Sequence, residues 1–139
     1  MKSRKFGDRW FVRIDRGEEI VETLKTFCRK RRIRLGTVTG IGATDRAVVG
    51  LFRTDTREYV TRELTGDMEI TNLAGNISTL EGRAYLHLHV TLSDPEYRAW
   101  GGHLTSAIVS GTLEAVVQEV EGSLERVFDE QVGLNLFKI

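Results

Sequence analysis

The sequence predicts an α+β fold: a single domain, residues 1–139, with a mostly antiparallel or mixed β-sheet of about seven strands and one main helix packed on it. Three observations support this prediction. A helical pattern of apolar residues occurs only once, early in the chain. β-branched or alternating segments follow it for most of the remaining length. No helical crossover separates those segments, and no change in composition marks a linker between two domains.

The first two elements are a strand and this helix. Residues 6–14 alternate loosely between apolar and polar side chains, which favours a strand ending at a turn-like Asp-Arg-Gly. Asp15 is expected to cap the helix, with Glu18 three residues later completing a capping box. Apolar residues then recur on one helical face, at Ile20, Val21, Leu24, Phe27 and Cys28. Acidic residues at the start and basic residues at the end match the helix dipole.

The rest of the chain is predicted to be extended. The segment 37–43 is β-branched and rich in glycine, which suggests a strand that another backbone approaches closely. Further extended segments are 47–53, 58–64, 68–73, 75–79, 84–92 and 108–120, the last long enough for one bent strand or two short ones.

Charge and cysteine content restrict the classes of function. Lys+Arg and Asp+Glu number 20 each, so the overall charge does not favour nucleic acid or an anionic membrane. Cys28 is the only cysteine, so no disulfide can form within the chain. The N-terminal segment lacks the apolar region of a signal peptide, and no run is long enough to cross a bilayer. We therefore expect a cytoplasmic protein that does not bind membranes.

The three histidines of the chain lie close together in sequence. His87 and His89 share one face of the strand 84–92, while the alternate face is wholly apolar. Two glycines precede His103 and would let the chain reverse, so that this ring could return to the other two. Three imidazoles are a zinc-type ligand set that leaves one coordination position open. The alternative is a set of ordinary polar residues on a solvent-facing strand.

Several other polar groups are weaker candidates. Arg83, Tyr85, Asp94 and Glu81 could support the metal ligands, or could belong to surface and turn chemistry. Basic side chains that could contact phosphate cluster at the helix end, where the dipole also favours cations: Arg29, Lys30, Arg31, Arg32 and Arg34. The segment TGIGAT (39–44) lacks the later glycine of a dinucleotide-binding fingerprint. Neither Ser106 nor Ser110 has a base beside it in the sequence, and no catalytic residue is identified.

Several segments together resemble one family. In chain order they are VTGIGATDRAVVGLFRTDTREY, LAGNIS, GRAYLHLHVTLSD, GGHL and GTLEAVVQEV, from about residue 13 to residue 128. They are similar to the PPC domain, which is conserved between plants and prokaryotes. The resemblance implies an α+β domain that assembles as a homotrimer. It also implies that His87, His89 and His103 bind a divalent metal, with zinc as the expected ion.

The resemblance also implies a DNA-binding or regulatory role, because this domain accompanies AT-hook motifs in plant nuclear proteins. Here the Arg-Gly-Arg-Pro core of an AT-hook is missing, since the one proline, Pro95, follows Asp94. The segment DPEYRAW also replaces the glycine-containing loop that usually precedes GGHL in prokaryotic members.

Three hypotheses follow. The chain is an oligomeric binding module for DNA or a protein, a metal-dependent enzyme or small-ligand sensor, or a structural oligomer with the histidines near a subunit interface.

Overall fold

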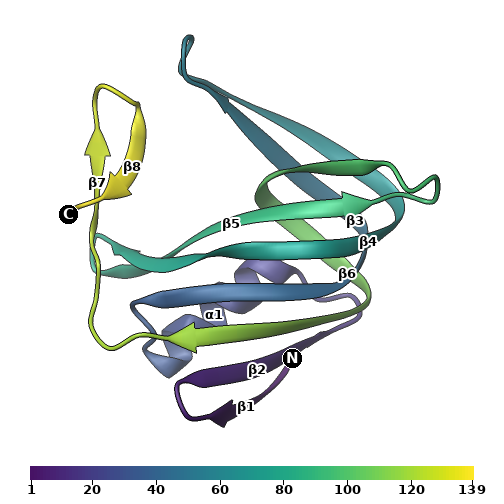
Figure 1. The fold of residues 1–139 in the computed structure, drawn as a ribbon, viewed down its shortest axis with the longest axis horizontal. Coiled ribbons are helices and arrows are strands. Elements are labelled where there is room, and N and C mark those ends of the chain that lie inside the picture. The colour runs from purple at the N-terminus through teal and green to yellow at the C-terminus, as the bar shows by residue number, and fades with distance from the viewer.

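The computed structural model describes residues 1–139 and contains eight strands and one helix (Figure 1). In chain order the elements are β1 (Lys2–Phe6), β2 (Arg9–Asp15), α1 (Ile20–Arg31), β3 (Gly36–Arg53), β4 (Glu58–Leu80), β5 (Arg83–Ser93), β6 (Ala99–Glu119), β7 (Arg126–Asp129) and β8 (Leu134–Phe137).

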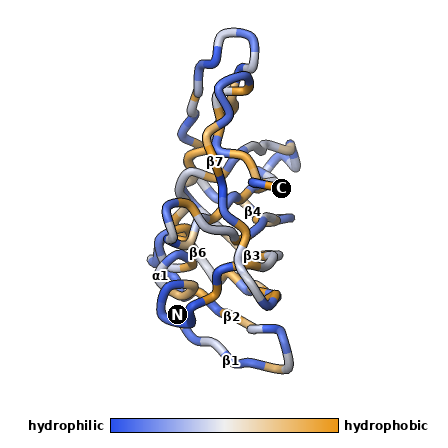
Figure 2. The backbone as a smooth tube through the Cα atoms, turned by 90° about the vertical axis from the view of Figure 1, so that its left-hand side faces the viewer, coloured by the Kyte–Doolittle hydropathy of each residue, from blue (hydrophilic) through white to orange (hydrophobic).

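Six of the strands form one antiparallel sheet in the order β1-β2-β6-β3-β4-β5. Strand β6 also pairs with β5, through residues 99–103, so β3, β4, β5 and β6 close on themselves. Strands β7 and β8 form a separate hairpin, which lies beside the end of β4 and β5 where these two strands are joined (Figure 1). The β3–β4 hairpin projects beyond the closed strands on the side of the β7–β8 turn, where Arg57 donates a hydrogen bond to the Gln131 carbonyl at 3.2 Å, and its tip is hydrophilic (Figures 1 and 2).

The structure is richer in β-strand than the predicted α+β fold of about seven strands, and all pairings between its strands are antiparallel. Segments predicted as separate strands are continuous. Strand β3 joins 37–43 to 47–53, and β4 joins 58–64, 68–73 and 75–79. Shifts in register between Gly40 and Gly42, and between Thr44 and Arg46, bend β3 without ending it. A bulge of this kind interrupts the side-chain alternation while the backbone stays paired, so the sequence pattern reads as a break.

The N-cap of helix α1 lies four residues later than predicted. It is Glu19 rather than Asp15, and the Glu19 carboxylate accepts hydrogen bonds from the backbone N–H groups of Val21 and Glu22. The same carboxylate accepts the backbone N–H of Ala107 at 3.0 Å, which ties the start of the helix to β6. Glu18 instead accepts the backbone N–H of Asp15 in the preceding turn. The Glu19 side chain, which is longer than that of the predicted cap Asp15, therefore accepts hydrogen bonds from both the helix and β6.

The core lies between α1 and the sheet. The predicted apolar face of the helix is buried, and so are the core-facing residues of β5 that the alternation indicated: Leu86, Leu88, Val90 and Leu92. The helix is twelve residues long, and the structure contains no helix that is both long and apolar enough to span a bilayer.

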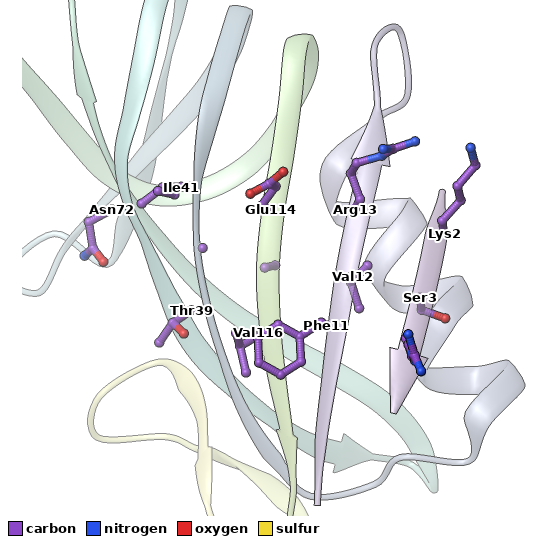
Figure 3. A pocket seen from close by; sticks show the side chains of 13 residues that line it. Lys2, Ser3, Phe11, Val12, Arg13, Thr39, Ile41, Asn72, Glu114 and Val116 are labelled. Carbon is purple, nitrogen blue, oxygen red and sulfur yellow. The ribbon is translucent and has the colours of Figure 1, made fainter. Parts of the chain in front are cut away.

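The sheet face that points away from α1 carries a shallow groove of about 690 Å³ across β1, β2, β6 and β3 (Figure 3). Phe11 and Ile41 lie along it and are exposed by 50% and 62% of their surface. Side chains of this kind gain free energy when they leave water, so the groove is suited to contact another apolar surface.

Candidate metal centre

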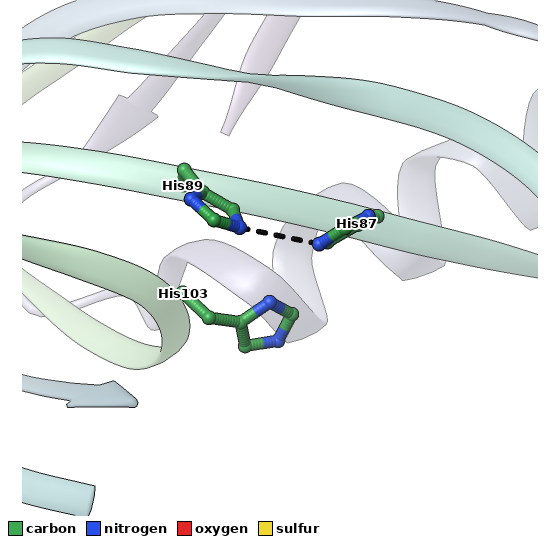
Figure 4. A group of neighbouring side chains, drawn as sticks. All are labelled: His87, His89 and His103. Carbon is green, nitrogen blue, oxygen red and sulfur yellow. Dashed lines mark hydrogen bonds between the residues drawn. The ribbon is translucent and has the colours of Figure 1, made fainter. Parts of the chain in front are cut away.

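The three histidines come from two paired strands and lie on the outer face of the closed sheet. His87 and His89 are two residues apart on β5, so they share a face while Leu86 and Leu88 point into the core. His103 is on β6 directly opposite His89 in the strand register. The three rings therefore gather around one point (Figure 4).

The chain reverses before His103 at a different place from the one predicted. The turn lies at residues 94–98, where Asp94 accepts the backbone N–H groups of Glu96 and Arg98, at 3.0 and 2.9 Å. Gly101 and Gly102 are already inside β6. Here glycine allows close packing: a Cβ on Gly102 would lie 2.6 Å from the Gly50 carbonyl oxygen of β3.

The ring positions fit the donor set of a divalent metal. The Nε2 atoms of His87 and His89 are 3.2 Å apart, and the ligand atoms of all three rings lie within 4.8 Å of one another. Two nitrogens bound to a tetrahedral zinc at 2.0–2.1 Å stand about 3.3 Å apart. His87 and His89 have about this spacing, and a ligand atom of His103 lies within 4.8 Å of theirs. The cluster can therefore hold a metal ion.

Electrostatics keep two of the rings in the state that a metal requires. Burial, together with the neighbouring His103, His89 and Arg126, lowers the pKa of His87 from 6.5 to about 4. Burial and His89 also lower the pKa of His103. A metal binds the neutral imidazole, so at neutral pH no proton has to leave His87 before an ion binds.

The surroundings of the cluster include residues that sequence reasoning missed. The Tyr59 ring packs edge-on against His103 with ring centroids 5.9 Å apart. On the other side, Asn76 is opposite His87 in the register and accepts a hydrogen bond from Arg126 at 2.8 Å. Neither Tyr59 nor Arg126 is near the histidines in sequence, and no spacing pattern marks them. The β3–β4 hairpin carries Tyr59 to the histidines, and the C-terminal β7–β8 hairpin carries Arg126.

The residues predicted to support the ligands have different positions. Tyr85 shares a face with His87, and its ring lies under the Arg126 guanidinium, 4.9 Å away. Arg83 and Glu81 are exposed at the start of β5 and in the turn before it. Asp94 is in the β5–β6 turn, where its carboxylate accepts hydrogen bonds from Trp100 and Arg98. These bonds, Trp100 first, lower the pKa of Asp94 to about 2.

The basic cluster lies at the end of α1 and just after it. Its five side chains, Arg29, Lys30, Arg31, Arg32 and Arg34, are all exposed, and none is in an ion pair. Arg31 lies over the Trp10 ring at 4.6 Å. Arg32 is the C-cap in the left-handed conformation. The structure does not bring this cluster together with the histidines.

The fold and sequence of this chain are similar to those of several known proteins. A supposed DNA-binding protein from Bacteroides thetaiotaomicron is 36% identical, with a TM-score of 0.97 over 99% of this chain and 96% of that one. A metal-containing protein from Archaeoglobus fulgidus is 34% identical, with a TM-score of 0.87 over 99% of each chain. The bifunctional protein GlmU of a Synechococcus strain is 30% identical over 122 residues, which are 86% of this chain and only 18% of that protein.

The family itself is shown by a match over most of the chain. The model of the Plants and Prokaryotes Conserved domain matches residues 1–121, which include β1 to β6 and all three histidines, and leaves only the C-terminal hairpin outside. The family resemblance seen in the sequence is thereby confirmed, and this chain belongs to the Plants and Prokaryotes Conserved (PCC) domain family.

Proposed function

We propose that this chain is an oligomeric PCC domain in which His87, His89 and His103 bind a zinc ion and present it to a small ligand. The convergence of three imidazoles from two paired strands, with their ligand atoms within 4.8 Å of one another, carries this proposal. The description of the Archaeoglobus relative as metal-containing supports it.

The donor set supports a reactive or ligand-binding centre rather than a closed structural one. Three protein ligands leave one position of a tetrahedral ion open, where it can polarise a bound oxygen. The chain's own residues hold the rings: strand pairing fixes His89 opposite His103, and Tyr59 packs against the edge of His103. No carboxylate forms a hydrogen bond with any of the three rings. The neighbouring Tyr59 ring instead packs edge-on against His103, which supports ligand binding.

Metal content of the purified, untagged protein tests this proposal. We expect about one zinc ion per chain, lost when all three histidines are replaced by alanine. Thr91→Ala is the matched control, because Thr91 is exposed on the same face of β5, two residues beyond His89. Protein that takes up no metal after incubation with zinc, or a triple variant that keeps it, would refute the proposed function.

We also propose that the domain assembles as a homotrimer, as the family resemblance implies. The exposed groove across β1, β2, β6 and β3 supports assembly, because Phe11 and Ile41 would leave water on contact with a second chain.

DNA binding is the second candidate function. The five exposed cations of the basic cluster support it, and so does the description of the Bacteroides relative. If DNA binds there, its affinity should fall steeply as salt rises, because each phosphate contact releases condensed counterions. A variant with Arg29, Lys30 and Arg32 changed to glutamine should then bind more weakly and with a shallower salt dependence. Binding that is insensitive to salt would exclude this function.

A further inference from the structure

Arg126 is a buried cation beside the histidines and has no acidic side chain to neutralise it. It belongs to β7, in the C-terminal hairpin outside the matched family region, and only 6% of its surface is exposed. No carboxylate lies within ion-pair distance of its guanidinium. A charge removed from water is costly unless an opposite charge and hydrogen bonds compensate for it.

The contacts of Arg126 are all neutral. It donates hydrogen bonds to the Ser78 hydroxyl at 2.8 Å, the Asn135 carbonyl at 2.7 Å and the Asn76 side-chain oxygen at 2.8 Å. Its guanidinium also lies over the rings of Tyr85 and Phe137, at 4.9 and 4.4 Å. A guanidinium has five N–H groups. Two of them therefore have no acceptor in this chain, and the positive charge is held in place without being neutralised.

Two independent features of the sheet place this charge next to the histidines. Asn76, which holds Arg126, is opposite His87 on the neighbouring strand. Tyr85, which stacks on Arg126, is two residues before His87 on the same face of β5. Same-face positions on paired strands are about 4.5–5.5 Å apart. The guanidinium and a metal held by the three rings would therefore lie within reach of one small molecule.

The one permanently charged side chain that acts on His87 is the Arg126 guanidinium, and no carboxylate acts on this ring. A divalent metal would add two further positive charges. A ligand that fills the open position would be favoured if it were negatively charged, because it would compensate both the metal and the guanidinium.

We propose that Arg126 and the three-histidine metal form one binding site for a small oxyanion, with one anionic group at the guanidinium and one oxygen at the metal. This inference rests on the proposed metal-binding function. It assigns the ligand class to short organic acids or phosphate, and it assigns a binding role to the C-terminal hairpin.

Anion titration of the cobalt-loaded protein tests the inference. The visible absorption of bound Co²⁺ responds to a change in its ligands, so malonate and inorganic phosphate are added in separate arms, with chloride as the control for ionic strength. We expect one of the two probes, or both, to change the spectrum saturably. The arm that binds more tightly identifies the source of the oxyanion.

Three variants separate the role of Arg126 from general effects on the fold. Arg126→Met should weaken binding of the anion by about tenfold or more, because it removes a charged hydrogen-bond donor. Arg126→Lys, which keeps the charge without the planar fork, should retain part of the affinity. Arg16→Met is the matched control, since it removes one charge from an exposed arginine in the turn before α1. It should bind the anion as the wild type does.

The Asn76→Asp variant tests whether the Arg126 charge contributes to anion binding if Arg126→Met fails to fold. A carboxylate at this position would neutralise Arg126 from within the chain while leaving the guanidinium in place. We expect this variant to bind cobalt and to lose the response to the anions.

The outcomes distinguish the two proposals. A wild-type protein that binds no cobalt refutes the metal function and the inference together. Cobalt binding with no response to either anion overturns the inference alone. The inference is also overturned if the folded, cobalt-loaded Arg126→Met variant binds the anion as tightly as the wild type. The same result for the Asn76→Asp variant would overturn it too.

Discussion

The protonation of His87 links the candidate metal centre to the stability of the fold. Its pKa is lowered to about 4 in the folded chain, chiefly by burial, from 6.5 for an unperturbed histidine. Between these two pH values the unfolded chain holds more protons on this residue than the folded chain does. The stabilisation is therefore fully present above about pH 6.5 and is lost as the pH falls toward 4.

This difference can be measured in the metal-free protein. We expect the thermal midpoint of the wild type to fall, relative to that of a His87→Gln variant, as the pH is lowered from about 6.5 to 4. Other acidic groups titrate in both proteins, so the difference between them isolates His87. Parallel pH profiles would show that the ring is not held in its neutral form by the fold.

The imidazole positions could be predicted from the sequence, but their environment could not. Alternation along a strand places His87 and His89 on one face, and this is a local property of the chain. The neighbours Tyr59 and Arg126 arrive from hairpins whose positions depend on long-range pairing. The position of the Arg126 charge beside the candidate metal ligands therefore follows only from the folded structure.

At the scale of single elements, β4 and β5 must approach each other closely beside His87. A Cβ on Gly75 would meet the carbonyl oxygen of His87 well inside van der Waals contact, and both atoms belong to paired strands. Neither backbone can move away without breaking the ladder. Glycine at this position is therefore a requirement of the strand pair that carries the candidate ligands.

Gly75→Ala should accordingly destabilise the fold by about 1–3 kcal/mol, in the range of an overpacked interior. It should also weaken zinc binding, because the backbone at His87 is displaced. Gly111→Ala is the matched control: a Cβ there would make an ordinary contact, 3.6 Å from the Ala43 side chain. Denaturant unfolding and zinc titration measure both effects. Equal stability in the two variants would contradict the close approach of β4 and β5.

The elements themselves were predicted unevenly. The apolar stripe of α1 and the core face of β5 followed from periodicity alone and are confirmed. The predicted start of α1 was wrong because the Glu19 carboxylate also accepts a hydrogen bond from the backbone N–H of Ala107 in β6. No local capping pattern contains this tertiary contact. Bulges in β3 imitate chain breaks, so segments predicted as separate strands are continuous, whereas β1, β7 and β8 were not predicted as strands of their own. The predictions of helix start and strand ends thus fail where contacts with residues distant in the sequence decide the local structure.

At the scale of the whole molecule, the groove opposite α1 is the surface on which assembly can be tested. Phe11→Glu with Ile41→Glu places two charges where the proposed trimer would bury apolar side chains. We expect the solution mass, measured by sedimentation or light scattering, to fall from three chains to one. Tyr97→Glu, at a β5–β6 turn residue that is 90% exposed, should leave the mass unchanged. A double variant that stays trimeric would place the interface on another surface.

We infer that His87, His89 and His103 bind one zinc ion together. X-ray absorption at the zinc edge of the loaded protein measures the ligand set directly. We expect three imidazole nitrogens at about 2.0–2.1 Å with one further light atom. A sulfur ligand, or fewer than three imidazoles, would contradict it and return the histidines to a face of ordinary polar side chains.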